Sequence, residues 1–259
     1  MCYFMKLDIT VRHEEVDFEN CKFFTNEDEL LEDYFVTLFR NGQIYGDYSL
    51  INCGEHRYNL FVNVPDPESI DKKFNNEYVN RSYIYMDIKT EILGKNILYY
   101  SNCSCKQIPF YVLRADADSD ECSSPVTCGK CGGDIPLYKI PYLFNEKEHY
   151  SLIEWQKTYA SVYELWIQSL SDRFVKNQIL NPKSALNKLS FDVRRELEDK
   201  LKKPVYFSFD NAIGYNPKNK KDEKQVCPIC GKALSDYPYK IGLVKMLKCD
   251  DCRISLVAL

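Results

Sequence analysis

The residues best suited to chemistry in this chain are two Cys-x-x-Cys pairs near the end of the printed sequence. Residues 231–248 separate the pairs, and this spacing is typical of a zinc ribbon. Zinc takes sulfur at about 2.3 Å in a tetrahedron, and four thiolates leave no open position, so the sequence predicts a structural ion. Gly231 is expected to supply a positive φ after the first pair. The predicted ligands are Cys227, Cys230, Cys249 and Cys252.

A third Cys-x-x-Cys pair lies in the middle of the chain and is also followed by glycine. It needs two more ligands, and a Cys-x-Cys pair upstream is the natural source, although its bite is tighter and less typical. Cys122 and His149 stay open as alternatives. A redox dithiol is the competing interpretation, but Gly132-Gly133 and Pro136 disfavour the helix that a thioredoxin-like pair opens. We predict a second structural zinc ion, held by Cys103, Cys105, Cys128 and Cys131.

The first residues indicate where the chain is found. Lys6 and Asp8 interrupt the apolar run over residues 1–11, so we expect no secretory signal. No stretch reaches the roughly 18 apolar residues of a membrane span. We therefore expect a cytoplasmic protein with reduced thiols, in which paired cysteines bind metal rather than form disulfides. The single cysteines Cys2, Cys21 and Cys53 are expected in the core.

The charge is distributed unevenly along the 259 residues, and the net value of −4 hides this. Residues 1–175 hold 17 Lys and Arg against 28 Asp and Glu, whereas residues 176–259 hold 17 against 10. The acidic part would repel a phosphate backbone, while the basic part could contact one. Mutual attraction between the two parts also explains the pattern and is the interpretation we prefer.

Hydrophobic periodicity predicts an α+β protein with a ferredoxin-like β-α-β-β-α-β sandwich in residues 1–95. Asn41-Gly42 is expected to end the first helix as a C-cap pair. Pro65-Asp66-Pro67 is expected to open the second helix. The predicted strands cover residues 5–11, 43–51, 57–64 and 82–88, and the predicted helices cover residues 25–41 and 68–78.

Three further regions are predicted after the sandwich. Residues 96–145 form a zinc-knuckle β region, residues 146–210 a helical region, and residues 211–259 a terminal zinc ribbon behind a charged linker over 216–224. Within these regions we expect strands over 96–100, 109–114 and 204–209, and helices over 149–170 and 190–202.

Several blocks of the sequence share one pattern: residues 124–131 with 136–141, 41–44, the Trp155 to Trp166 helix, 204–207 and 248–253. These blocks resemble an uncharacterised bacterial family described as zinc-ribbon-containing, candidate nucleic-acid-binding proteins. A related pattern occurs in double-CxxCG proteins, some of which are described as immunity proteins encoded beside secreted toxins. The resemblance implies zinc ligation by the three Cys-x-x-Cys pairs and assigns no catalytic residue.

The remaining residues predict no enzyme. His13, His56 and His149 are scattered, so we expect no base with a positioned partner. The phosphate-binding pattern GxxxxGK[ST] is absent from the sequence. The acidic run over residues 116–121 lacks the glycine and closing Glu of a calcium loop, and we interpret it as solvated.

Two kinds of binding protein therefore remain. The preferred hypothesis is a toxin-neutralising protein of the immunity type, because an acidic body with acidic clusters over 27–33 and 116–121 suits a basic protein partner. The alternative is a nucleic-acid-binding ribbon, with Tyr237 and Tyr239 stacking on bases. The basic residues of that alternative are Lys232, Lys240, Lys245, Lys248 and Arg253.

Overall fold

The computed structural model describes residues 2–96, 102–115, 123–211, 225–239 and 245–258. The chain divides into two compact units. Unit 1 comprises Met1–Asn102, Glu121–Ser123 and Pro136–Tyr150. Unit 2 comprises Cys103–Asp120, Ser124–Ile135 and Ser151–Leu259, so it contains every predicted metal ligand.

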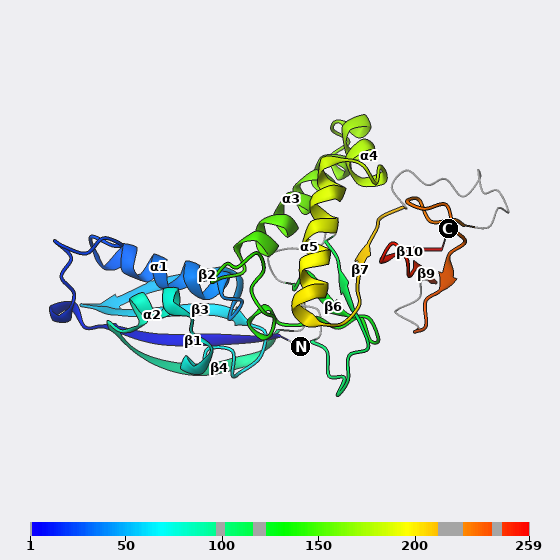
Figure 1. The fold of residues 1–259 in the computed structure, drawn as a ribbon. Helices are drawn as coiled ribbons and strands as arrows, with labels where there is room; N and C mark the ends of the chain where they lie inside the picture. Colours follow the sequence, from blue (N-terminus) through cyan, green and yellow to red (C-terminus); the bar gives the residue numbers. More distant parts are fainter. Residues whose placement is uncertain (1, 97–101, 116–122, 212–224, 240–244, 259) are drawn as a thin grey trace. The chain divides into compact units, whose positions relative to one another are not determined.

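Unit 1 is built on a four-stranded antiparallel sheet with strand order β2-β3-β1-β4. Two helices lie on one face of this sheet (Figure 1), and their apolar side chains form one core with the inward residues of β1 and β3. The outward residues of β1 are largely polar, as the alternating pattern predicts. The elements are β1 (Cys2–Val11), α1 (Glu27–Arg40), β2 (Tyr45–Gly54), β3 (Arg57–Val64), α2 (Glu77–Tyr83) and β4 (Met86–Asn96).

The predicted first helix is confirmed, together with its caps. The Asn26 side chain accepts from the Glu29 backbone N–H at 2.9 Å, and the Glu29 carboxylate accepts from the Thr25 N–H at 2.7 Å. The first of these bonds satisfies an amide that the first helical turn leaves without a partner, and the second ties the residue before the cap to the helix. Asn41 is the C-cap, and Gly42 follows it with a φ of 75°.

The predicted second helix and fourth strand are wrong in position. Residues 67–70 form turns and Lys72–Phe74 a 3-10 helix, while α2 begins after Asn76, whose side chain caps the Val79 N–H at 2.8 Å. The strand begins at Met86 and runs to Asn96, because it pairs with the whole length of β1. Met86 and Ile88 follow the alternating pattern that predicted a strand, but most of the later residues are exposed, and pairing with β1 sets where the strand ends.

Unit 2 contains a six-stranded mixed sheet with order β6-β5-β7-β10-β9-β8. Strands β5, β7 and β10 are parallel, and the outer pairs are antiparallel. Phe207 on β7 is fully buried among the rings of Trp155, Tyr159 and Phe191. The elements are β5 (Tyr111–Leu113), β6 (Val126–Cys128), α3 (Tyr150–Ile167), α4 (Asp172–Leu180), α5 (Ala185–Leu201), β7 (Val205–Ser208), β8 (Ser235–Asp236), β9 (Met246–Cys249) and β10 (Ile254–Val257).

In unit 2 the predicted helices over 149–170 and 190–202 and the strands over 109–114 and 204–209 are confirmed, with shifted ends. Helix α5 begins earlier, at Ala185, behind the Ser184 cap, and α4 was not predicted. The predicted strand over 96–100 and the linker over 216–224 lie almost wholly outside the described residues.

The predicted α+β class is confirmed, since both units combine helices with a sheet. The division into four regions stays a prediction. Among the helices that the structure describes, none combines the length and the apolar character that a membrane crossing requires.

Candidate metal centres

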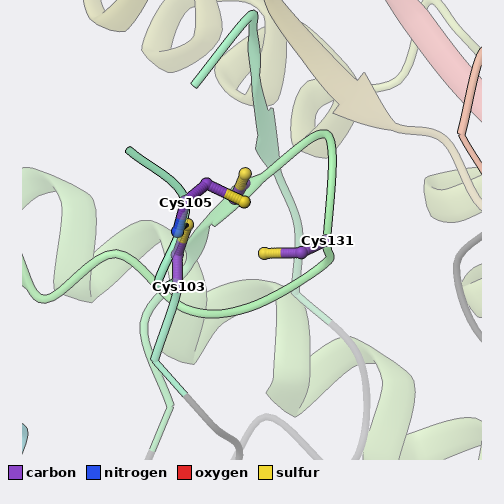
Figure 2. A group of neighbouring side chains, drawn as sticks. Cys103, Cys105 and Cys131 are labelled. Carbon is purple, nitrogen blue, oxygen red and sulfur yellow. Dashed lines mark hydrogen bonds between the residues drawn. The ribbon is translucent and has the colours of Figure 1, made fainter. Parts of the chain in front are cut away.

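Four thiols of unit 2 meet in what we call the central thiol group: Cys103, Cys105, Cys128 and Cys131. Their sulfur atoms all lie within 4.8 Å of one another, and Figure 2 shows the labelled side chains turned toward one shared space. Cys128 ends β6, and Cys131 follows in the next turn. Cys103 and Cys105 come from the loop that precedes β5.

The ribbon thiol group contains Cys227, Cys230, Cys249 and Cys252, again within 4.8 Å. Cys249 ends β9, and Cys252 lies just before β10. The sulfurs of Cys230 and Cys249 are 3.7 Å apart. A tetrahedral site with metal–sulfur bonds of about 2.3 Å has sulfur–sulfur edges of about 3.8 Å, so this pair is already at a suitable separation for one ion.

The first halves of the two groups are built by the same backbone hydrogen bonds. The N–H of Cys128 donates to Gly133 O at 2.8 Å, and the N–H of Cys227 donates to Lys232 O at 2.8 Å. The glycine after each pair donates back to the first cysteine and has a φ of 73° at Gly132 and 72° at Gly231. The positive φ predicted for Gly231 is confirmed, and we call this shared turn the knuckle.

The second halves differ. In the ribbon thiol group, Cys249 pairs with Ile254 in the antiparallel β9–β10 ladder, so the sheet itself positions the ligand. Arg253 occupies a left-handed conformation with a φ of 54° directly after Cys252. In the central thiol group, Cys103 N–H donates to Asp134 O at 2.8 Å, and the Cys105 N–H points at the Cys103 sulfur at 3.3 Å.

Backbone amides and neighbouring thiols set the ionisation of both groups. The Lys232 N–H lowers the pKa of Cys230 to about 7. Burial, and then the neighbouring thiols, raise the pKa of Cys252 well above its usual range. Burial likewise raises the pKa of Cys103, whereas the Gly133 N–H and the surrounding thiols hold that of Cys131 below normal despite its burial. Several thiolates so close together repel one another, so each group needs a cation to ionise fully.

Of the alternative ligands that the sequence left open, His149 is not part of the central thiol group. Cys122 lies outside the described residues. His149 belongs to unit 1, where its ring is buried against Tyr142. Of the single cysteines, Cys2 is buried as predicted, but Cys53 is exposed on β2, so the expectation that it lies in the core is wrong.

Of the two aromatic residues predicted to stack on bases, Tyr237 is buried inside unit 2 and Tyr239 is partly buried against the same cluster. Tyr237 is 9% exposed, and its ring lies 5.4 Å from that of Phe110. Tyr239 lies on the same ring at 6.1 Å. Phe110 also contacts Tyr206, so these four rings join the ribbon to the centre of the sheet. A buried ring cannot stack on a base, and the stacking expectation is wrong for Tyr237.

The basic residues predicted for nucleic acid are paired with acids. Lys245 contacts Asp236 at 2.8 Å, and Lys232 contacts Asp251. Lys248 contacts Asp250 at 2.5 Å, and Arg253 contacts Glu198 at 3.4 Å and Asp250 at 4.0 Å. Lys240 lies outside the described residues. Each described cation thus has a carboxylate beside it, which weakens the positive field that would attract a phosphate backbone.

In unit 1, the acidic cluster predicted over residues 27–33 lies on α1 beside an apolar groove. The groove has a volume of about 270 Å³, and the exposed carboxylates of Asp28 and Glu32 stand at its rim. Its apolar walls are Leu31, Phe35, Tyr48, Leu50, Ile9 and Leu60. The second acidic cluster, predicted over residues 116–121, lies outside the described residues.

Sequence reasoning missed a third group of candidate ligands. His13 and His56 are far apart in the chain, yet their rings stack with centroids 4.6 Å apart, and both face Glu27. The expectation that the histidines have no positioned partner is therefore wrong for these two. The hairpin between β2 and β3 brings them together, and spacing in the sequence gives no sign of such a contact.

Comparison with known proteins finds one similarity. Residues 104–209 match a family described as a domain of unknown function, DUF2310. The matched range contains Cys105, Cys128 and Cys131 of the central thiol group, and it ends before the ribbon thiol group. No curated protein and no solved structure matches the chain. The chain is thus similar over this range to a family whose description assigns no activity.

Proposed function

We propose that this chain is a non-enzymatic binding protein, stabilised by two structural zinc ions, whose partner is a protein of the toxin type that immunity proteins neutralise. The observation that carries the zinc assignment is that unit 2 contains two groups of four thiols, each within 4.8 Å. Sulfur-only tetrahedral sites select zinc or iron–sulfur chemistry, and closed zinc sites of this kind are structural.

In unit 1, the strand order supports the proposed architecture, and one surface supports the binding role. Its strand order β2-β3-β1-β4, with both helices on one face, supports the ferredoxin-like arrangement proposed from the sequence. Such folds serve many functions, so the partner has to be argued from the surface. The groove beside α1 supplies that surface, because an apolar trough with carboxylates at its rim complements a segment that carries apolar and basic side chains.

A protein partner is favoured over nucleic acid by the pairing of the ribbon cations. Free lysines and arginines gain affinity for a phosphate backbone by releasing its counterions. Lys232, Lys245, Lys248 and Arg253 each lie beside a carboxylate and would have to exchange that partner first. The nucleic-acid alternative predicts instead a salt-dependent affinity for DNA or RNA that falls in a Lys232→Ala/Lys245→Ala double variant.

The metal assignment is tested by elemental analysis of the full chain after extensive desalting. We expect two equivalents of zinc, and one in Cys128→Ser or Cys227→Ser. The exposed Cys53→Ser variant is the matched control and should retain both. Iron with its visible absorption, or unchanged zinc in both ligand variants, would contradict the assignment.

The partner assignment is tested by cross-linking and capture from the native host, with and without nuclease. We expect one dominant protein that survives nuclease and is lost from Asp28→Lys/Glu32→Lys. The matched control is Glu154→Lys/Glu164→Lys, which changes the net charge equally on exposed positions of α3. The captured protein should be toxic when expressed alone and harmless when co-expressed with this chain. Capture of nucleic acid, or equal loss in both charge variants, would overturn the proposal.

A further inference from the structure

Two histidines from separate elements of unit 1 converge on one carboxylate oxygen of Glu27, which belongs to a third element. Glu27 is the first residue of α1, His13 begins the 3-10 helix His13–Glu15, and His56 lies in the turn between β2 and β3. The Nδ1 atoms of both histidines are 2.6 Å from Glu27 Oε1. The side chain of Glu27 is 12% exposed, whereas His13 and His56 are 49% and 38% exposed.

The backbone and a second layer of contacts hold these groups in place. The Tyr58 hydroxyl donates to the other oxygen of Glu27 at 2.8 Å and so fixes the carboxylate. The Val11 N–H donates to His56 O at 2.9 Å, which ties the turn to the end of β1. His56 also has a φ of 57°, an uncommon conformation for a residue with a side chain. This conformation belongs to the tight turn that joins β2 and β3.

We propose that His13, His56 and Glu27 form a third metal site, which binds a first-row divalent transition metal. Imidazole nitrogens suit zinc, copper, iron and nickel, and two histidines with one carboxylate are an established ligand set for such ions. Neutral imidazole offers a lone pair at Nδ1 when its proton is on Nε2. Three protein ligands leave open positions that solvent or a small anionic ligand can fill.

This site differs in kind from the two thiol groups. It has no sulfur, and its histidines reach solvent. The ion would therefore exchange with the medium more readily than an ion enclosed by four thiolates. The Tyr58 hydroxyl takes the role of an outer partner that orients a ligating carboxylate.

The experiment is equilibrium dialysis of the full chain, with both thiol groups loaded with zinc, against Co²⁺. We expect one further equivalent of Co²⁺, with an absorption spectrum free of thiolate-to-cobalt charge transfer. His13→Ala and Glu27→Gln should each weaken this binding at least about 100-fold, because loss of an outer partner alone costs about 10–100-fold. Tyr58→Phe should fall in that lower range. Glu14→Gln, an exposed neighbour of His13, is the matched control and should bind as the parent does.

The competing explanation is that the two imidazoles simply donate hydrogen bonds to Glu27 and join three elements. In that case no further equivalent of Co²⁺ binds, or it binds equally to His13→Ala and the parent, and either result overturns the proposal. Thermal unfolding separates the two cases further. A metal site predicts that added Co²⁺ raises the unfolding temperature of the parent and of Glu14→Gln but not of His13→Ala.

Discussion

The central and ribbon thiol groups begin with the same knuckle and complete it in different ways. In both knuckles the carbonyl oxygen of the first cysteine accepts from the N–H of the glycine four residues later. The N–H of that cysteine donates to the carbonyl oxygen of the residue after the glycine. The ribbon thiol group then takes its second pair from the end of β9 and the turn into β10, where strand pairing fixes the register. The central thiol group takes its second pair from a loop before β5.

This difference predicts that the bound metal has a different structural effect in each thiol group. Sheet hydrogen bonds can hold Cys249 near its position before any ion binds, because β10 also pairs with β7 in the middle of the sheet. Among the contacts described above, one backbone hydrogen bond holds Cys103 in place. Its N–H donates to Asp134 O. We therefore expect the ion of the central thiol group to order more of its own surroundings than the ion of the ribbon thiol group.

The largest expected effect comes from removing both ions with a strong chelator. Structural zinc sites contribute about 10–16 kcal/mol of apparent binding free energy, which is comparable to the whole stability of a domain. Both tryptophans, Trp155 and Trp166, lie in unit 2, and Trp155 is buried. Chelation should shift their emission to longer wavelength. Unchanged emission after loss of both ions would show that the sheet of unit 2 does not depend on metal.

Single ligand variants test the difference between the two groups. Cys103→Ser and Cys249→Ser should each lose one equivalent of metal. Hydrogen–deuterium exchange should then show loss of protection over residues 102–109 in the first variant, whereas β10 stays protected in the second because β7 still pairs with it. Equal loss of protection in β10 and in the loop would contradict the difference we infer.

The sequence predicted the eight thiols and the class of fold because each depends on local pattern. Cysteine spacing reports a metal turn, and the 3.6-residue pattern reports α1 and α3. The sequence failed where distant elements decide. The position of β4 is set by its partner β1, the burial of Tyr237 by Phe110, and the contact of His13 with His56 by the hairpin. Alternation marks only part of β4, and the other two contacts leave no periodic signal.

A smaller effect is expected at the second residue of each knuckle. Gly129 is in close contact with Phe110, and an added methyl group would overlap that ring. Because Phe110 packs on Tyr206 and Tyr237, Gly129→Ala should cost about 1–3 kcal/mol. The equivalent residue of the ribbon knuckle, Pro228, is exposed, and Pro228→Ala should cost about 0.5 kcal/mol or less. Thermal unfolding of both variants with metal bound measures the difference, and equal melting temperatures would contradict it.

The smallest difference between the two groups is expected at the glycine that closes each knuckle. Gly132 and Gly231 have the same left-handed φ, so Ala at either position should destabilise its own knuckle by about 1–2 kcal/mol. Asn tolerates this conformation better, and Gly231→Asn should therefore cost less than Gly231→Ala. Metal affinity, measured by competition with a chelator of known strength, should fall by a similar factor in Gly132→Ala and Gly231→Ala. A large difference between these two factors would mean that the shared hydrogen bonds do not make the knuckles energetically equivalent, and that the loop before β5 determines the affinity of the central thiol group.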